Sequence, residues 1–286
     1  MDWSEKELQK RDKIDYQRIW VGISLALILY LLVRHLSLYG FFVFAAGGIM
    51  IVQYEFYRFY FQQRMIPSIL FGLLLGFVVA YSFFNKRFFF DKEIITELIF
   101  IVIICHLFWV GDIRTNLTDI AVVFLGIIYI SWLLSYLILL RNLLNGRMFL
   151  FFLFLVIWMG DTAAYYIGRH FGRHKLSPRI SPNKTIEGAI GGLMASLAIA
   201  FISRLWFLPI LSLKDCLYLG IILSLLGQIG DLSESMFKRS SGVKDSSNLI
   251  PGHGGLLDRI DSLIFTAPFL YYYVIFFIEK EKFITI

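Results

Sequence analysis

Ten ionisable side chains lie between residues 231 and 261, in a stretch that joins two segments apolar enough to cross a membrane. They are Asp231, Glu234, Lys238, Arg239, Lys244, Asp245, His253, Asp258, Arg259 and Asp261. An ionisable group within the hydrocarbon of a bilayer is disfavoured by about 2.5–3.5 kcal/mol, so such groups normally face a water-filled cavity. This stretch is therefore where the sequence predicts the chemistry of the protein.

Two short pairs of carboxylates, Asp231 with Glu234 and Asp258 with Asp261, stand three residues apart on predicted helices. Each pair therefore lies on one face of its helix. Four carboxylates brought together would repel one another or become protonated unless a cation holds them. Hard oxygen ligands with no Cys and few His select Mg²⁺ or Mn²⁺ over zinc. We expect all four carboxylates to bind Mg²⁺, and the sequence leaves open whether a second cation shares the site.

Basic side chains surround the acidic pairs; they are Lys238, Arg239, Lys244 and Arg259. A carboxylate-bound metal with Lys and Arg is typical of phosphoryl or nucleotidyl transfer, in which the protein positions phosphates and neutralises their charge. The alternative is a set of intramembrane salt bridges, which would explain the helix but not the Gly-rich loop PGHGG after it. His253 in that loop is either a ligand or acid, or a hydrogen-bonding fixture. The loop lacks the spacing of a P-loop.

A second polar loop, residues 169–187, carries five Lys or Arg residues and two prolines. Asn183, Lys184 and Glu187 lie at the entry of the next predicted helix, where backbone N–H groups favour phosphate. An ordinary positively charged cytoplasmic loop is the alternative. Upstream, Asp161 lies within an apolar run and needs a partner or water, so we predict that it contributes to the site.

The elements that position these residues are long apolar segments. The chain is 58% hydrophobic and 17% charged, against about 25% charged in soluble domains. Runs of about 20 apolar residues, the length of a membrane-spanning helix, recur along it. We therefore predict an all-α, polytopic integral membrane protein with about nine transmembrane helices, near residues 19–36, 39–61, 66–84, 94–113, 120–140, 148–170, 187–207, 216–237 and 260–278.

The distribution of charge predicts both orientation and organisation. With the N-terminus in the cytoplasm, 17 of the 27 Lys and Arg residues fall in cytoplasmic segments, as the positive-inside rule requires. Both polar loops of the C-terminal half then face the cytoplasm. Residues 1–147 are nearly free of charge within the predicted spans, apart from Glu55, Glu97 and Asp112 near span ends, and we predict a transmembrane scaffold there. Residues 148–286 are predicted to form the catalytic region.

The C-terminal motifs also carry a resemblance. Ser235-Met-Phe-Lys-Arg239, then Lys244-Asp245, then Pro251-Gly-His-Gly-Gly-Leu-Leu-Asp-Arg-Ile-Asp261 resembles the signature of the phosphatidate cytidylyltransferases, also called CDP-diacylglycerol synthases. The upstream strings GDTAAY (160–165), SPNKTIEG (181–188) and GDLSES (230–235) resemble that family too. The resemblance covers about residues 160–265, while the first half is similar only in being apolar and multi-spanning.

The resemblance implies that CTP and phosphatidic acid react, with Mg²⁺, to give CDP-diacylglycerol and pyrophosphate for phospholipid biosynthesis. The expected catalytic residues are Asp231, Asp258, Asp261, Lys244 and Asp245. The expected substrate-binding residues are Asp161, Asn183, Lys184, Glu187, Ser235, Lys238, Arg239, His253 and Arg259. We expect a multi-pass protein of the cell inner (plasma) membrane, a homodimer in contact with membrane lipids and not with nucleic acid, whose active site faces the cytoplasm.

Two other classes of membrane protein share part of this pattern. A CDP-alcohol phosphotransferase also has Mg²⁺-binding aspartates, but its D-G-x-x-A-R pattern is absent here. A transporter for an anionic solute would explain the basic loops and the buried carboxylates. Such a transporter would neither need the metal nor release pyrophosphate, so these two properties separate it from the enzyme.

Overall fold

The computed structural model describes residues 24, 27–61, 66–85, 93–108, 113–244, 246–247, 249 and 254–279. Two of the predicted site residues, Asp245 and His253, lie outside these ranges. So does the beginning of the first predicted span, 19–36, of which residues 27–35 are described as helical.

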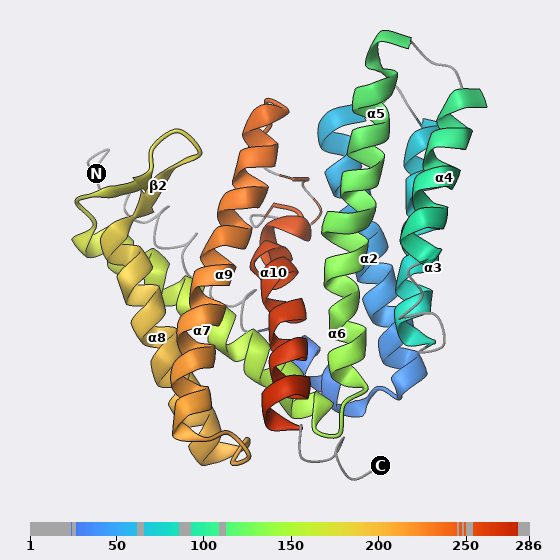
Figure 1. Cartoon of the computed structure of the whole chain (residues 1–286). Coiled ribbons are helices and arrows are strands. Elements are labelled where there is room, and N and C mark those ends of the chain that lie inside the picture. Colours follow the sequence, from blue (N-terminus) through green and yellow to red (C-terminus); the bar gives the residue numbers. More distant parts are fainter. Residues whose placement is uncertain are drawn as a thin grey trace, which may run out of the picture.

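The described chain is a bundle of long helices (Figure 1). The N-terminal half contains α2 (Leu38–Phe61), α3 (Ile66–Phe84), α4 (Glu93–Phe108) and a continuous rod made of α5 (Ile113–Leu125), the π-helical η1 (Gly126–Trp132) and α6 (Leu133–Arg141). The C-terminal half contains α7 (Gly146–Phe171), α8 (Ile186–Trp206), α9 (Leu213–Ser240), α10 (Leu257–Tyr273) and the π-helical η2 (Val274–Ile278).

Seven helices in the described residues are long and apolar enough to cross a membrane, the rod from Arg114 to Arg141 counting as one. The predicted all-α, multi-pass membrane fold is confirmed, and these seven coincide with seven of the nine predicted segments. The predicted span 94–113 corresponds to α4, whose apolar part, Thr96–Cys105, is shorter. The count of nine stays a prediction.

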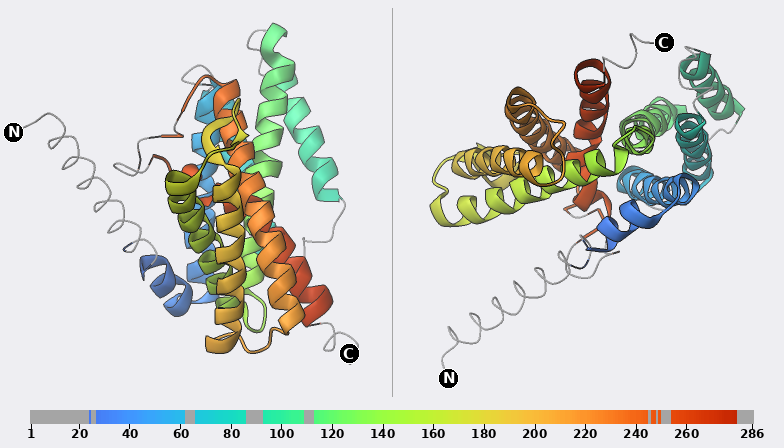
Figure 2. Two further views of the ribbon diagram at one scale, coloured as in Figure 1. Left: turned by 90° about the vertical axis from the view of Figure 1, so that its left-hand side faces the viewer. Right: turned by 90° about the horizontal axis from the view of Figure 1, so that it is seen from below.

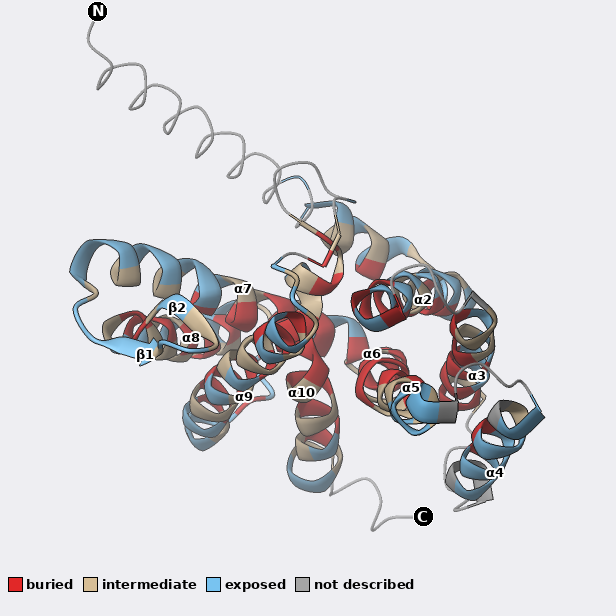
Figure 3. Ribbon diagram, turned by 90° about the horizontal axis from the view of Figure 1, so that it is seen from above, coloured by how far each residue is buried: buried red, intermediate tan, exposed pale blue. Residues whose placement is uncertain are grey.

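Helix α10 lies between the two halves of the bundle. It packs against α9 on one side and α6 on the other, and the views from below and from above show it between the α7–α9 group and the α2–α6 group (Figures 2 and 3). Leu257 and Asp261, near its start, are buried. Residues at the start of α10 are therefore within reach of both halves.

The basic loop between α7 and α8 contains a small antiparallel hairpin that the sequence analysis did not predict. Strand β1 (Lys175–Ser177) pairs with β2 (Ser181–Thr185), with Lys175 opposite Thr185. Thr185 then caps α8, since its side chain accepts a hydrogen bond from the N–H of Gly188 at 3.1 Å, which is the ordinary role of Thr at a helix start. The hairpin thus leads directly into α8 at the same end of the bundle as the end of α9 (Figure 1).

A neutral polar network is buried in the N-terminal half. The Gln53 side chain donates to Tyr57 Oη at 2.8 Å and to the carbonyl of Gly72 at 2.9 Å, and Ser131 Oγ donates to Gln53 Oε1 at 2.8 Å. Tyr57 in turn donates to the carbonyl of Val123 at 2.8 Å. These bonds tie α2 to α3, to α5 and to η1. Since buried polar groups are tolerated when their hydrogen bonds are made, this network is suited to holding the scaffold together.

Candidate active site

Asp231, Glu234, Ser235 and Lys238 lie three or four residues apart on α9 and form one polar stripe along it. Glu234 is completely buried, and Ser235 and Lys238 are each 8% exposed. The helix begins with a capping box, in which Ser212 and Asp215 each accept the other's backbone N–H. Glu234, Ser235 and Lys238 therefore face the protein interior, and the side chains that contact them determine which chemistry is possible there.

Lys238 joins two of the predicted carboxylates. Its Nζ lies 2.5 Å from Glu234 Oε2, one turn earlier on α9, and 2.6 Å from Asp258 Oδ1 on α10. All three side chains are largely shielded from solvent. Removing such charges from water is costly, and their mutual attraction offsets that cost only with good geometry and further hydrogen bonds. We call Glu234, Lys238 and Asp258 the ionic cluster.

Asp258 receives the further hydrogen bonds. Its Oδ2 accepts from the N–H of Ser246 at 3.0 Å, from Ser246 Oγ at 2.7 Å and from the N–H of Gly255 at 2.7 Å. The chain enters this turn through Gly254, whose φ of +79° is in the left-handed region that favours glycine. Asp258 thus bonds to two points of the loop between α9 and α10 (residues 241–256), which we call the Gly-rich loop from here on, while it pairs with Lys238.

A second group of carboxylates lies where α9 and α10 come closest. Asp231 Oδ2 is 2.7 Å from Lys184 Nζ on β2. Asp261 is 7% exposed and accepts the N–H of Ser262 at 2.7 Å, and it is within electrostatic range of Asp161, Asp231 and Glu234. Gly230 permits this approach, since a Cβ there would lie 2.6 Å from the carbonyl oxygen of Asp261.

This second group decides how a metal would fit. In the part of the chain that the structure describes, no three His, Cys, Asp or Glu side chains are already arranged to hold a metal ion. Mg²⁺, however, usually takes one or two protein carboxylates and completes its shell with water and substrate phosphates. Asp231 and Asp261, on neighbouring helices that touch at Gly230, are a donor set of that kind. Glu234 and Asp258 are both paired with Lys238 in this structure.

Residues of the basic loop form hydrogen bonds with one another and with the end of α9. Glu187 accepts from the N–H of Arg173 at 3.1 Å and from Nδ1 of His174 at 2.6 Å. Arg239, at the end of α9, donates to the carbonyl of Ile180 at 3.3 Å and to that of Val243 at 3.2 Å. Arg239 therefore links the basic loop to the start of the loop that follows α9.

The remaining predicted site residues lie around these groups. Asn183, Lys244 and Arg259 are exposed at the same end of the bundle, and Asp161 is on an accessible face of α7. The structure therefore brings together Lys184, Asp231, Glu234, Lys238, Asp258 and Asp261, with Asp161 within electrostatic range of them. It places basic residues at their edge, where an incoming phosphate would first meet the protein.

One residue that contacts this region was missed by the sequence analysis. Glu55 of α2 is 3% exposed and accepts hydrogen bonds from the side chains of Ser246 and Ser247 and from the backbone N–H groups of Leu256 and Leu257. The sequence alone predicts Glu55 only as an acid near a span end. The sequence feature that could have indicated Glu55 is the same one that indicated Asp161, namely a carboxylate within an apolar run.

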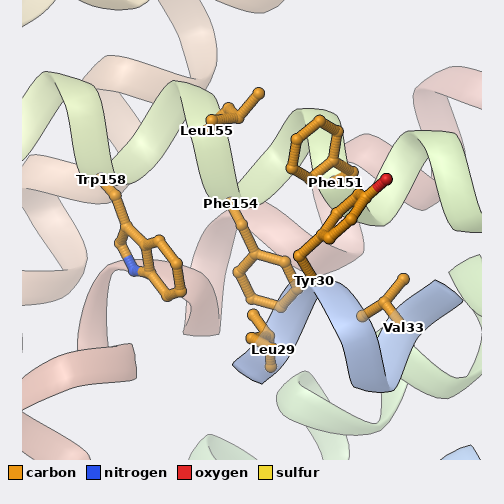
Figure 4. A pocket seen from close by; sticks show the side chains of 7 residues that line it. All are labelled: Leu29, Tyr30, Val33, Phe151, Phe154, Leu155 and Trp158. Carbon is orange, nitrogen blue, oxygen red and sulfur yellow. The ribbon is translucent and has the colours of Figure 1, made fainter. Parts of the chain in front are cut away.

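An apolar pocket lies apart from these charged groups, between the helical residues 27–35 and α7 (Figure 4). Its lining residues are Leu29, Tyr30, Val33, Phe151, Phe154, Leu155 and Trp158. Its lining contains no charged side chain, so it provides nothing with which to bind a phosphate or a metal ion. The charged side chains described above lie instead where the end of α9 meets the start of α10.

Comparison with known proteins agrees with the motifs. The model of the cytidylyltransferase family matches residues 16–277. A protein of Bacillus subtilis (strain 168) named phosphatidate cytidylyltransferase is 36% identical over 269 residues, which cover 91% of this chain and 98% of that protein. Proteins of the same name are 46% identical over 157 residues in Staphylococcus saprophyticus, and 51% identical over 128 residues in Staphylococcus aureus (strain COL).

The staphylococcal matches cover 60% and 48% of those two proteins, whereas the match to the Bacillus protein covers nearly its whole length. The family model likewise includes the N-terminal helices as well as the C-terminal motifs. The similarity thus extends well beyond the stretch from 160 to 265 that carries the signature strings. This chain belongs to the cytidylyltransferase family.

Proposed function

We propose that this enzyme transfers the cytidylyl group of CTP to phosphatidic acid, giving CDP-diacylglycerol and pyrophosphate. The observation that carries the proposal is the similarity over 91% of the chain to a protein named phosphatidate cytidylyltransferase. The clustered carboxylates and lysines at the adjoining ends of α9 and α10 support it, because two polyanionic substrates need such groups to meet.

In this reaction the protein positions the two substrates and neutralises the charge of their phosphates. An oxygen of the lipid phosphate, already an anion at neutral pH, attacks the α-phosphorus of CTP. A new P–O bond forms while the bond from the α-phosphorus to the bridging oxygen breaks, and pyrophosphate leaves with that electron pair. No nucleophile from the protein is required, so the residues act by stabilising charge that develops on the phosphates.

Lys184 and Lys238 are placed for that task. Each lies within 2.7 Å of a carboxylate in this structure, Lys184 of Asp231 and Lys238 of Glu234 and Asp258. We propose that they exchange these partners for phosphate oxygens when substrate binds. The exposed Lys244, Arg239 and Arg259 would hold the phosphates at the edge of the site, where Arg and Lys form charge-assisted hydrogen bonds.

The metal belongs to the proposal as well. Mg²⁺ would supply positive charge that stabilises the negative charge developing on the phosphates. The close approach of α9 and α10 at Gly230 supports Asp231 and Asp261 as its carboxylate ligands. Asp258 and Glu234 join them if Lys238 moves to a phosphate. Asp161, Asn183 and Glu187, with Ser235, His253 and Asp245, complete the predicted pocket.

One assay tests reaction, base and metal together. Protein purified in detergent is given phosphatidic acid, each of the four nucleoside triphosphates in turn, and either Mg²⁺ or EDTA; lipid product and pyrophosphate are measured. We expect turnover with CTP and Mg²⁺ and none with EDTA. Turnover of a polyprenyl phosphate with no reaction of phosphatidic acid would disprove the lipid assignment and leave nucleotidyl transfer standing.

The location of the site is a separate proposal. We propose that it faces the cytoplasm from the cell inner membrane, because the basic residues concentrate at the end of the bundle that carries the hairpin and the end of α9. Cysteine at Ser177 or Ser241, in a background without Cys105 and Cys216, should react with an impermeant thiol reagent from the cytoplasmic side alone. Reaction from outside would reverse the orientation.

Two further expectations accompany this function. We propose a homodimer, which the mass of the protein–detergent particle, corrected for bound detergent, tests directly; a single-chain mass would disprove it. We also propose that residues 148–286 form the catalytic region and residues 1–147 its scaffold. The contacts of Glu55 suggest how the scaffold acts on the site.

A further inference from the structure

Glu55 is a buried carboxylate in an apolar helix of the N-terminal half. Its Oε1 accepts from Ser247 Oγ at 2.5 Å and from the N–H of Leu256 at 3.1 Å, and its Oε2 accepts from the N–H of Leu257 at 2.8 Å and from Ser246 Oγ at 3.3 Å. These donors are separated from it by about 190–200 residues in sequence. All of them belong to the Gly-rich loop or to the start of α10.

The start of α10 has no side-chain cap of its own. Leu256 occupies the N-cap position and makes no capping hydrogen bond, although the first N–H groups of any helix lack partners within it. Glu55 supplies those partners from α2. A negative charge at this end of a helix also interacts favourably with the helix dipole.

The same contacts reach the ionic cluster through Ser246. Its hydroxyl lies 2.7 Å from Asp258 Oδ2 and 3.3 Å from Glu55 Oε2. Gly255 passes between these groups so closely that an added Cβ would collide with Ser246 Oγ and with the carboxylate of Glu55. Any displacement of Glu55 is therefore transmitted to the loop and to the first turn of α10.

We propose that Glu55 is a positioning residue of the active site, which holds the Gly-rich loop and the first turn of α10 so that Asp258 and Asp261 face α9. The proposal rests on the proposed function for the meaning of the site. It assigns an energetic role in that site to the N-terminal half, which otherwise serves as a scaffold. Glu55 itself touches neither substrate in this proposal.

The test compares Glu55→Gln, Glu55→Asp and a control, Glu97→Gln, which removes an exposed carboxylate from α4 in the same half. Gln keeps the shape of Glu but turns an NH₂ group toward donors, whereas Asp keeps the charge with a shorter reach. We expect Glu55→Gln to lower kcat at least about tenfold, as small displacements of catalytic groups do. The KM for CTP should change far less, Asp should restore part of kcat, and Glu97→Gln should behave as the wild type.

A second measurement follows the loop directly. Cysteine replaces Leu249, an exposed loop residue, in a background without the two native cysteines, and the rate of its reaction with a thiol reagent is compared with and without Glu55→Gln. We expect faster reaction when Glu55 is replaced. A merely structural role would lower the melting temperature and leave the kcat of the folded protein and the labelling rate unchanged, and that result would overturn the proposal.

Ser247→Ala provides a test if Glu55→Gln does not fold. It removes the shortest of the four hydrogen bonds from the loop side and leaves the carboxylate with three donors. We expect a smaller loss of kcat with faster labelling at position 249; wild-type values of both would overturn the proposal. If the wild-type protein made no lipid product from CTP, the proposed function would fail. Faster labelling at position 249 in Glu55→Gln would still show that Glu55 positions the loop.

Discussion

Helix α2 contributes to two buried polar networks of opposite character. Gln53 belongs to the neutral network with Tyr57 and Ser131, whose hydrogen bonds join uncharged groups. Glu55 contacts the loop that bonds Asp258 of the ionic cluster. Residues two apart on a helix point to different sides, so one turn of α2 serves the scaffold on one side and the site on the other.

The two networks differ in how completely their hydrogen bonds are made. In the neutral network Gln53 uses its amide nitrogen twice and its oxygen once. In the ionic cluster the two oxygens of Glu234, although buried, have Lys238 as their ion-pair partner but no hydrogen bond of good geometry. Incomplete satisfaction of buried charge is expensive, and it is found where proteins bind ligands. The neutral network is therefore suited to stabilising the fold, whereas the ionic cluster retains the incompletely satisfied charge that the proposed exchange of partners requires.

The largest expected effect is that of Lys238→Met. It would leave Glu234 and Asp258 buried without their cation, and breaking a buried ion pair in this way costs about 3–5 kcal/mol. We expect a large fall in the melting temperature in detergent and loss of detectable turnover. Adding Glu234→Gln should restore part of the stability and none of the activity. Recovery of both in the double variant would contradict an exchange of partners by Lys238.

Asp231→Asn should separate activity from stability. Its ion pair with Lys184 is partly exposed, with 35% of the Asp231 side chain accessible, and such pairs contribute about 0–1 kcal/mol. We expect kcat to fall by about 10²-fold or more, since a charge that faces the phosphates and the metal is lost, with an almost unchanged melting temperature. Near-normal turnover with Mg²⁺ would remove Asp231 from the metal site.

Tyr57→Phe tests the neutral network, where we expect a loss of stability without a loss of activity. It removes the hydroxyl that donates to the carbonyl of Val123 and accepts from Gln53, and an unsatisfied buried group costs about 1–3 kcal/mol. We expect a lower melting temperature and an unchanged kcat in the folded protein. A loss of kcat larger than the loss of stability would show that the two networks are coupled.

Ser212→Ala should have the smallest effect. It removes half of the capping box of α9, at the end of the helix far from the ionic cluster, and the loss of such a cap costs about 0.5–2 kcal/mol. We expect a small fall in the melting temperature and wild-type values of kcat and KM. Altered kinetics would mean that the far end of α9 controls the position of Asp231.

Much of the fold could be predicted because helix formation and hydrophobic periodicity are local properties. The predicted segment 66–84 coincides with α3, and 148–170 and 187–207 lie within two residues of α7 and α8. The hairpin β1–β2 was not predicted, because its strands are short and polar and carry no alternating apolar pattern. The acidic pairs were visible because residues three apart on a helix share a face.

By itself, the sequence determined the membrane helices, the charged stretch from 231 to 261 and the motifs that place the chain in its family. Only the tertiary structure decided which charges meet. Lys238 joins Glu234 within α9, as the spacing allows, but its contact with Asp258 depends on how α9 and α10 pack. The contacts of Lys184 with Asp231 and of Glu55 with the loop likewise cross between elements. Spacing along a helix is set by its 3.6-residue turn, whereas contacts between elements depend on close packing of the whole bundle.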